Sequence, residues 1–105
     1  MHEMKLYSNP FELIKNGKKR IEIRLYDEKR KLIKINDIIK FKNIDTNEII
    51  KTKVVNIYNF NSFKELFSRF NKNDLGVDDY NVMYNYYSEE EEKKYGVVGI
   101  QIELI

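Results

Sequence analysis

Residues 17–24 read GKKRIEIR, and this stretch carries more information about the fold than any other part of the chain. Gly17 can adopt the left-handed backbone conformation that ends a helix. From Arg20 onward, charged and apolar residues alternate, and this period of two predicts a strand with one buried face. The other face of that strand carries Glu22 and Arg24. The stretch therefore predicts a helix end that leads into a strand with a charged side.

The segment before this stretch has the signals of a strand followed by a short helix. Residues 4–7 are predicted to form the strand. Asn9 fits the N-cap position, with Pro10 as the first helical residue and Glu12 three residues after the cap. We expect a helix of about two turns that ends at Gly17.

The rest of the chain adds further strands. Strands are predicted at residues 38–41, 49–58 and 96–104, with turns at 35–37 and 43–47. Residues 26–34 are too polar to bury, and we expect them to form a loop. Together with the helices, these pieces predict an α+β fold built on a small sheet or barrel.

Later helices are predicted from their start signals. Ser62 is followed three residues later by Glu65, and apolar residues then recur at spacings of three and four, so this stripe is expected to face the core. Residues 74–87 predict a short irregular helix against the sheet. Ser88 precedes the acidic run Glu89–Glu92, which we interpret as a solvated helix start, because consecutive helical residues cannot all face one cation.

Length and composition exclude several classes of protein. The chain has 105 residues, which is typical of one domain, and we expect residues 1–105 to form it. It contains no cysteine, which excludes disulfides, thiolate nucleophiles and thiolate zinc sites. The single histidine, His2, excludes a multi-histidine metal site, and we interpret it as a solvated residue of the N-terminal tail. We expect no metal and no cofactor.

The chain also lacks the signals of membrane insertion. No apolar run approaches the roughly 20 residues of a membrane helix, and the polar start does not have the layout of a secretory signal. We expect a soluble, cytoplasmic protein without a membrane partner.

Charge is unevenly distributed along the chain. Residues 1–42 carry twelve Lys or Arg against six Asp or Glu, whereas residues 43–105 carry seven against eleven. The basic half is a candidate anion-binding region. A compositional bias is the alternative explanation, because the chain has twelve Asn and no Ala.

The charged side of the strand at residues 21–25 is the candidate site. It presents Glu22 and Arg24 on one face, with Lys19 at its entrance. Lys and Arg can clamp a phosphate or a carboxylate, while Glu22 can orient Arg24 or accept a proton. The alternative is an ordinary ion pair on a solvated face, worth at most about 1 kcal/mol.

The spacing Gly17-x-Lys19-x-x-Glu22-x-Arg24 resembles the G-x-K-x-x-E-x-R signature of the ASCH domain family. Further similarity covers most of the chain, at residues 10–11, 26–30, 37–41 and 95–100. The resemblance implies a small, mostly antiparallel β-barrel of the PUA type with two to four short flanking helices, a cleft at the signature residues, and an association with RNA binding.

Some members of this family are ribonucleases, and a related branch hydrolyses acetylcytidine with a Lys, a Thr and a Glu. In this chain the Lys corresponds to Lys19, but Glu22 occupies the position of the Thr nucleophile. The third residue has no motif to place it, and Glu65 is one candidate. The departure at Glu22 argues against amide hydrolysis by the same route.

Three hypotheses follow. In the first, an RNA or nucleotide contacts Lys19 and Arg24, and Glu22 positions them. Outer lysines add salt-dependent electrostatic attraction: Lys18, Lys29 and Lys31. Tyr7 and Tyr26 flank the signature, and each either stacks on a base or packs in the core.

The second hypothesis is a metal-free hydrolase, either a ribonuclease or a modified-nucleoside amidohydrolase. Lys19 would stabilise negative charge and Glu22 would act as the base. Two flanking cations weaken such a base by lowering its pKa. The third hypothesis is a module that binds a small anion or a protein partner.

Overall fold

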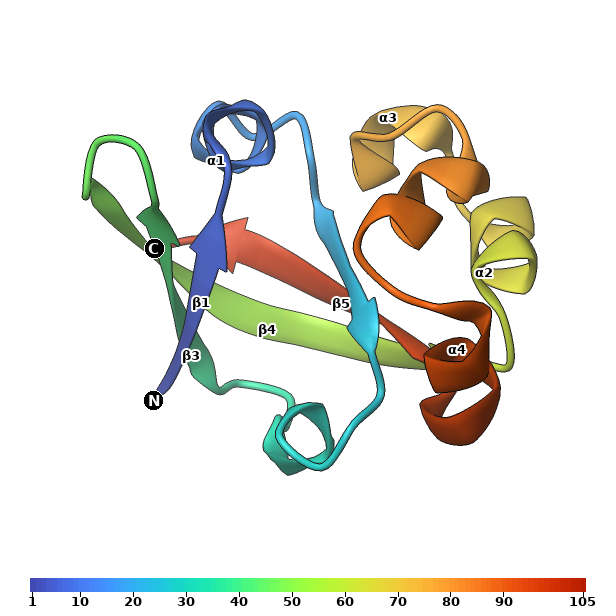
Figure 1. The fold of residues 1–105 in the computed structure, drawn as a ribbon. Coiled ribbons are helices and arrows are strands. Elements are labelled where there is room, and N and C mark those ends of the chain that lie inside the picture. The colour runs from blue at the N-terminus through green and yellow to red at the C-terminus, as the bar shows by residue number, and fades with distance from the viewer.

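The computed structural model describes residues 1–105, which form one five-stranded sheet and four short helices. The strands are β1 (His2–Leu6), β2 (Ile21–Leu25), β3 (Ile38–Asn43), β4 (Ile49–Phe60) and β5 (Val97–Leu104). Their order across the sheet is β1-β3-β4-β5-β2; β1 and β3 are parallel, and the other three pairings are antiparallel. The sheet curls into a half-barrel whose two edges are β1 and β2 (Figure 1). The prediction of a mostly antiparallel α+β barrel is confirmed.

The helices are distributed unequally around this sheet. They are α1 (Ser8–Lys15), α2 (Phe63–Arg69), α3 (Lys72–Leu75) and α4 (Glu89–Tyr95), with 3-10 turns η1 (Arg30–Leu32) and η2 (Tyr80–Asn85). The first helix follows β1 directly, whereas α2, α3, η2 and α4 gather beside β2 (Figure 1). None of the helices is both long and apolar enough to cross a bilayer.

The apolar residues form two clusters. The first cluster packs the inner face of the sheet against α1: Met4, Leu6, Phe11, Ile14, Ile33, Ile39, Phe41, Val54, Val98, Ile100 and Ile102. The second packs β2 against the helical layer: Ile21, Ile23, Leu25, Phe63, Leu66, Leu75, Met83 and Val97. The apolar stripe of α2 therefore faces the core, as the sequence predicts.

Helix α1 begins two residues earlier than its sequence signals predict. Tyr7 is the N-cap and makes no side-chain capping bond, so the assignment of Asn9 as the N-cap was wrong. Pro10 lies at the third helical position, where it is tolerated because the first four N–H groups of a helix have no internal partner. The predicted end is confirmed: Gly17 has φ +75°, and its N–H donates to the Ile14 carbonyl over 3.0 Å.

Two further expectations are corrected. His2 belongs to β1 and not to a loose tail, because its Nε2 lies 2.8 Å from Asp37 Oδ2. Helix α4 starts after Ser88 as predicted, and Ser88 forms a capping box with Glu91, but Glu92 is buried and not solvated. Its carboxylate accepts from the Phe63 N–H over 2.7 Å and from the Tyr84 hydroxyl over 2.9 Å. Glu92 thus joins α4 to α2 and η2, a contact between residues far apart in sequence.

Candidate functional site

Strand β2 and the residues just before it bring Lys19, Glu22 and Arg24 together. Glu22 Oε2 accepts from Arg24 Nε over 3.2 Å and from Arg24 Nη2 over 3.0 Å. Its Oε1 accepts from the Ile23 N–H over 3.1 Å and lies 3.5 Å from Lys19 Nζ. Both carboxylate oxygens are therefore engaged by donors from the protein, and the three charged groups form one connected cluster.

This cluster is buried, unlike an ordinary surface ion pair. Lys19 and Glu22 are only 4% and 5% exposed, and the Arg24 side chain is 14% exposed. The segment after α3 covers it: Lys19 Nζ donates to the Leu75 carbonyl, and a Cβ at Gly76 would lie 3.0 Å from Lys19 Cδ. Gly76 also has φ +71°, so both its conformation and this close approach favour glycine.

Burial and mutual attraction set the protonation of the cluster. Burial lowers the pKa of Lys19, and the charge of Glu22 only partly offsets this effect. Burial by itself would raise the pKa of Glu22, but the charges of Arg24 and Lys19 outweigh it and hold that pKa below its usual range. Burial opposes the charge of Arg24 as well, yet Glu22 and Tyr87 raise its pKa. Glu22 is therefore an anion at neutral pH.

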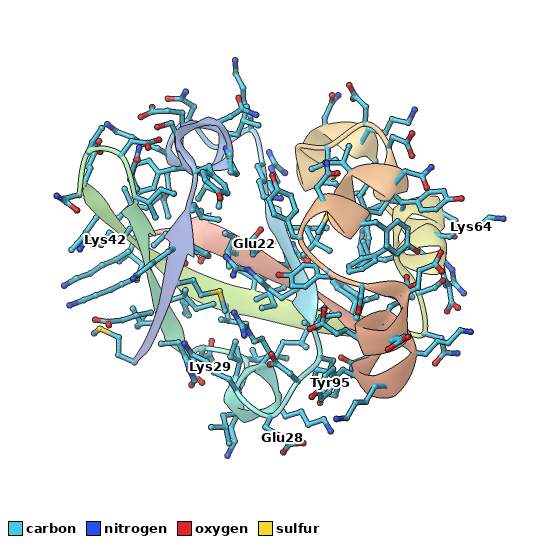
Figure 2. All side chains as sticks on the ribbon, in the orientation of Figure 1. Glu22, Glu28, Lys29, Lys42, Lys64 and Tyr95 are labelled. Atoms are coloured by element: carbon cyan, nitrogen blue, oxygen red, sulfur yellow. The ribbon has the colours of Figure 1, made fainter.

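The charged cluster forms the polar floor of a cavity of about 350 Å³. This cavity lies between the two edge strands, where Figure 2 shows Glu22 in the gap between β1 and β2. At this gap Arg24 Nη2 donates to the Lys5 carbonyl over 3.1 Å, so the guanidinium links the two unpaired edges. The Nη1 donors of Arg24 are used by neither Glu22 nor Lys5.

The walls of the cavity are apolar and aromatic. Tyr7 and Tyr86 each remain 57% exposed, and their ring centroids lie 6.2 Å apart. Tyr87, Val82 and Met83 line the cavity beside them. Tyr7 comes from the start of α1, whereas the other four come from η2 and the residues after it. The site therefore combines a charged floor with two accessible aromatic rings.

Two predicted binding residues lie outside this cavity. Lys18 lines a separate shallow depression with Arg20 and residues 71–74. Tyr26 is half-buried at the edge of the first apolar cluster, and the ammonium of Lys31 lies 5.7 Å from its ring centroid. Glu65, the candidate third residue for hydrolysis, is exposed, and its backbone N–H donates to Ser62 Oγ. Glu65 and Tyr26 line another depression, separate from the cavity.

Sequence reasoning missed the aromatic residues that follow η2, Tyr86 and Tyr87, as part of the site. The pattern of residues 74–87 indicates a helix packed against the sheet, but it carries no signal that Tyr86 meets Tyr7. That contact joins positions far apart in the chain and depends on how the residues after η2 approach the start of α1.

The donor set of the cavity suits an anion or a polar heterocycle better than a metal ion. Glu22 is its one carboxylate, and that carboxylate is already paired with two cations. No group of three or more His, Asp or Glu side chains in the structure is arranged to hold a metal. The site offers arginine donors and aromatic faces.

The half-barrel and the position of Gly17, Lys19, Glu22 and Arg24 on it define the class of protein. The family model of the ASCH domain matches residues 4–105, and the chain belongs to this family. No curated protein matches the sequence.

Solved structures support the same assignment. The chain is 46% identical to hypothetical protein PH0355, with a TM-score of 0.86 over 98% of this chain and 97% of that one. It is 42% identical to protein PF0455 from Pyrococcus furiosus, with a TM-score of 0.77 over 99% and 96% of the two chains. ASCH from Zymomonas mobilis shares only 16% identity but has the same fold, with a TM-score of 0.65 over 96% of this chain and 65% of that one.

Proposed function

We propose that this ASCH domain binds RNA or a nucleotide, and that one nucleotide occupies the cavity between β1 and β2. The family as a whole is generally proposed to bind RNA. The observation that carries the proposal is the combination of a charged floor and an aromatic mouth in one cavity. Unstacked bases are recognised by stacking on aromatic rings and by hydrogen bonds to their polar edges.

The geometry suggests a role for each group. Tyr7 and Tyr86 offer the faces on which a base can stack. Arg24 offers its Nη1 donors to a base edge or a phosphate, while its Nε and Nη2 donors are held by Glu22. Glu22 thus orients the guanidinium before a ligand arrives, which reduces the entropy lost on binding. Lys19 forms an ion pair with the other carboxylate oxygen of Glu22 and so helps to hold it in place.

Binding is tested by titrating a labelled single-stranded RNA and a mononucleotide against wild type and Tyr86→Ala. Loss of one stacking face is expected to weaken binding by about 1–3 kcal/mol, roughly five- to 150-fold. Tyr95→Ala, on α4 and outside the cavity, is the matched control and should bind like wild type. Saturable binding that Tyr86→Ala leaves unchanged would contradict the proposal.

A second candidate function is hydrolysis of RNA or of a modified nucleoside. The lowered pKa of Lys19 favours it, because a buried lysine that loses its proton more readily can take part in acid–base chemistry. The lowered pKa of Glu22 opposes it, because a carboxylate held between two cations is a weak base.

Incubation with RNA and with acetylcytidine separates the two candidates. Product formed by wild type, and lost in both Glu22→Gln and Lys19→Met variants that still melt cooperatively, would establish hydrolysis by this site. Product formed equally by wild type and both variants would exclude it.

A further inference from the structure

A second concave region lies on the outer face of the half-barrel. It is a groove of about 510 Å³ lined by six basic residues, Lys5, Arg24, Lys29, Arg30, Lys40 and Lys42, and by the single acidic residue Glu3. We call this region the basic groove. Figure 2 shows Lys42 and Lys29 on the side of the molecule where β1 and β3 lie, away from the helical layer.

The strand register explains why these lysines gather. In the parallel pair of β1 and β3, Lys5 lies opposite Lys42, and Glu3 lies opposite Lys40. The residues between them, such as Met4 and Phe41, are buried in the first apolar cluster. Because side chains alternate across a strand, the lysines must point to the outer face. No helix covers this face (Figure 1).

The charges of the groove are largely uncompensated. Lys5, Lys29, Lys40 and Lys42 form no ion pair, although several other lysines of the chain do. Glu3 also forms no ion pair, so it does not neutralise the lysine opposite to it. Four unpaired ammonium groups in one groove make a surface that is complementary to a polyanion.

The groove is continuous with the cavity. Lys5 and Arg24 line both of them, and the hydrogen bond from Arg24 Nη2 to the Lys5 carbonyl lies at their boundary. An RNA strand that leaves the cavity across this boundary enters the basic groove. A mononucleotide has only its own phosphate, whereas an RNA strand brings one more phosphate for each nucleotide that follows.

We propose that the basic groove binds the phosphates of a single-stranded RNA whose unstacked base occupies the cavity. This inference rests on the proposed function and narrows its ligand from any nucleotide to a polynucleotide. Single strands fit because a base must leave its stack to enter the cavity, whereas the bases of a duplex are paired and stacked.

The experiment compares a labelled single-stranded RNA of about ten nucleotides with a mononucleotide at several salt concentrations. The groove variant is the double substitution Lys40→Gln and Lys42→Gln. The control replaces Lys64 and Lys93 by Gln in the helical layer; Figure 2 shows Lys64 on the opposite side from Lys42.

Loss of two phosphate contacts should reduce the slope of log affinity against log salt by about 1.4 for single-stranded RNA. Mononucleotide binding should stay unchanged, and the control should match wild type. Oligonucleotide binding by the groove variant with the wild-type slope would overturn the inference and leave the proposed function standing. If the groove variant lost oligonucleotide binding while Tyr86→Ala bound fully, the proposed function would be overturned. So would the proposal that one strand occupies both the cavity and the basic groove.

Discussion

The molecule has two groups of charged side chains on strands, and they differ in what covers them. Glu22 and Arg24 on β2, together with Lys19 just before it, lie beneath α3 and η2 and form ion pairs with one another. On the outer face of β1 and β3, no helix covers the lysines, and they remain unpaired. Glu22 and Arg24 in the first group, and the lysines of β1 and β3 in the second, arise from the same alternating pattern. The difference shows that a charge on a strand becomes part of a built site only when another element covers it and a partner compensates its burial.

The largest effect is expected when the buried cluster loses its anion. Glu22→Ala leaves Lys19 and Arg24 buried without a counter-charge, and breaking a buried pair in this way costs about 3–5 kcal/mol. Urea unfolding at neutral pH measures the loss. Glu28→Ala is the control, because that side chain is 88% exposed, and it should change stability by less than about 0.5 kcal/mol. Equal losses of unfolding free energy in the two variants would contradict the claim that the buried charges depend on their partners more than exposed charges do.

Acid should remove the same contribution without a large change in structure. The pKa of Glu22 is lower in the folded protein than its ordinary value of 4.5, so its contribution is fully present above that value. It is lost as the pH falls through the lower, folded-state pKa, because the unfolded chain then binds the proton first. The difference in unfolding free energy between wild type and Glu22→Gln, measured from pH 7 to pH 3, should therefore shrink as the pH falls below 4.5.

The comparison with Glu22→Gln is needed because Asp37, which bonds to His2, also has a lowered pKa. Asp37 titrates equally in both proteins and cancels in the difference. A difference that stays constant across this pH range would show that Glu22 is not held ionised by its neighbours.

A smaller effect is expected at the glycine that covers Lys19. Gly76→Ala forces a left-handed alanine, which costs about 1–2 kcal/mol, and places a Cβ 3.0 Å from Lys19 Cδ. Stability and nucleotide binding should both decrease. Gly17→Ala is the matched control, because Gly17 has a similar φ of +75° but no atom within 4 Å of the added Cβ. Gly17→Ala should lower stability without lowering nucleotide binding. Reduced binding in both variants would argue against a role in binding for the packing of Gly76 on Lys19.

The smallest effect on stability is expected in the basic groove. Lys40→Gln combined with Lys42→Gln removes two charges that form no ion pair, so the free energy of unfolding should stay within about 0.5 kcal/mol of wild type. Thermal and urea unfolding at low salt provide the measurement. A loss above about 1 kcal/mol would mean that these lysines are structural, contrary to their placement on the outer face.

Features that depend on neighbouring residues could be predicted from the sequence. The end of α1 at Gly17, the caps at Ser62 and Ser88, and the alternation of β2 each involve residues within a few positions of one another. Such local signals also explain why the resemblance to the ASCH family, carried by four closely spaced residues, led to the correct fold. The error at Asn9 was local too, because Pro10 is compatible with more than one position in the first helical turn.

The composition of the cavity depends on contacts that no local pattern contains. That Glu22 and Arg24 share one side of a strand follows from the spacing of their positions, since side chains alternate along an extended backbone. That Lys19, which precedes β2, joins them does not follow from this alternation. That this side is buried, that Tyr7 meets Tyr86, and that Lys18 and Tyr26 lie elsewhere follow from how η2 and β1 approach β2. The burial of a residue depends on which elements pack against it. In this chain the elements that cover β2 are separated from it by many residues of sequence.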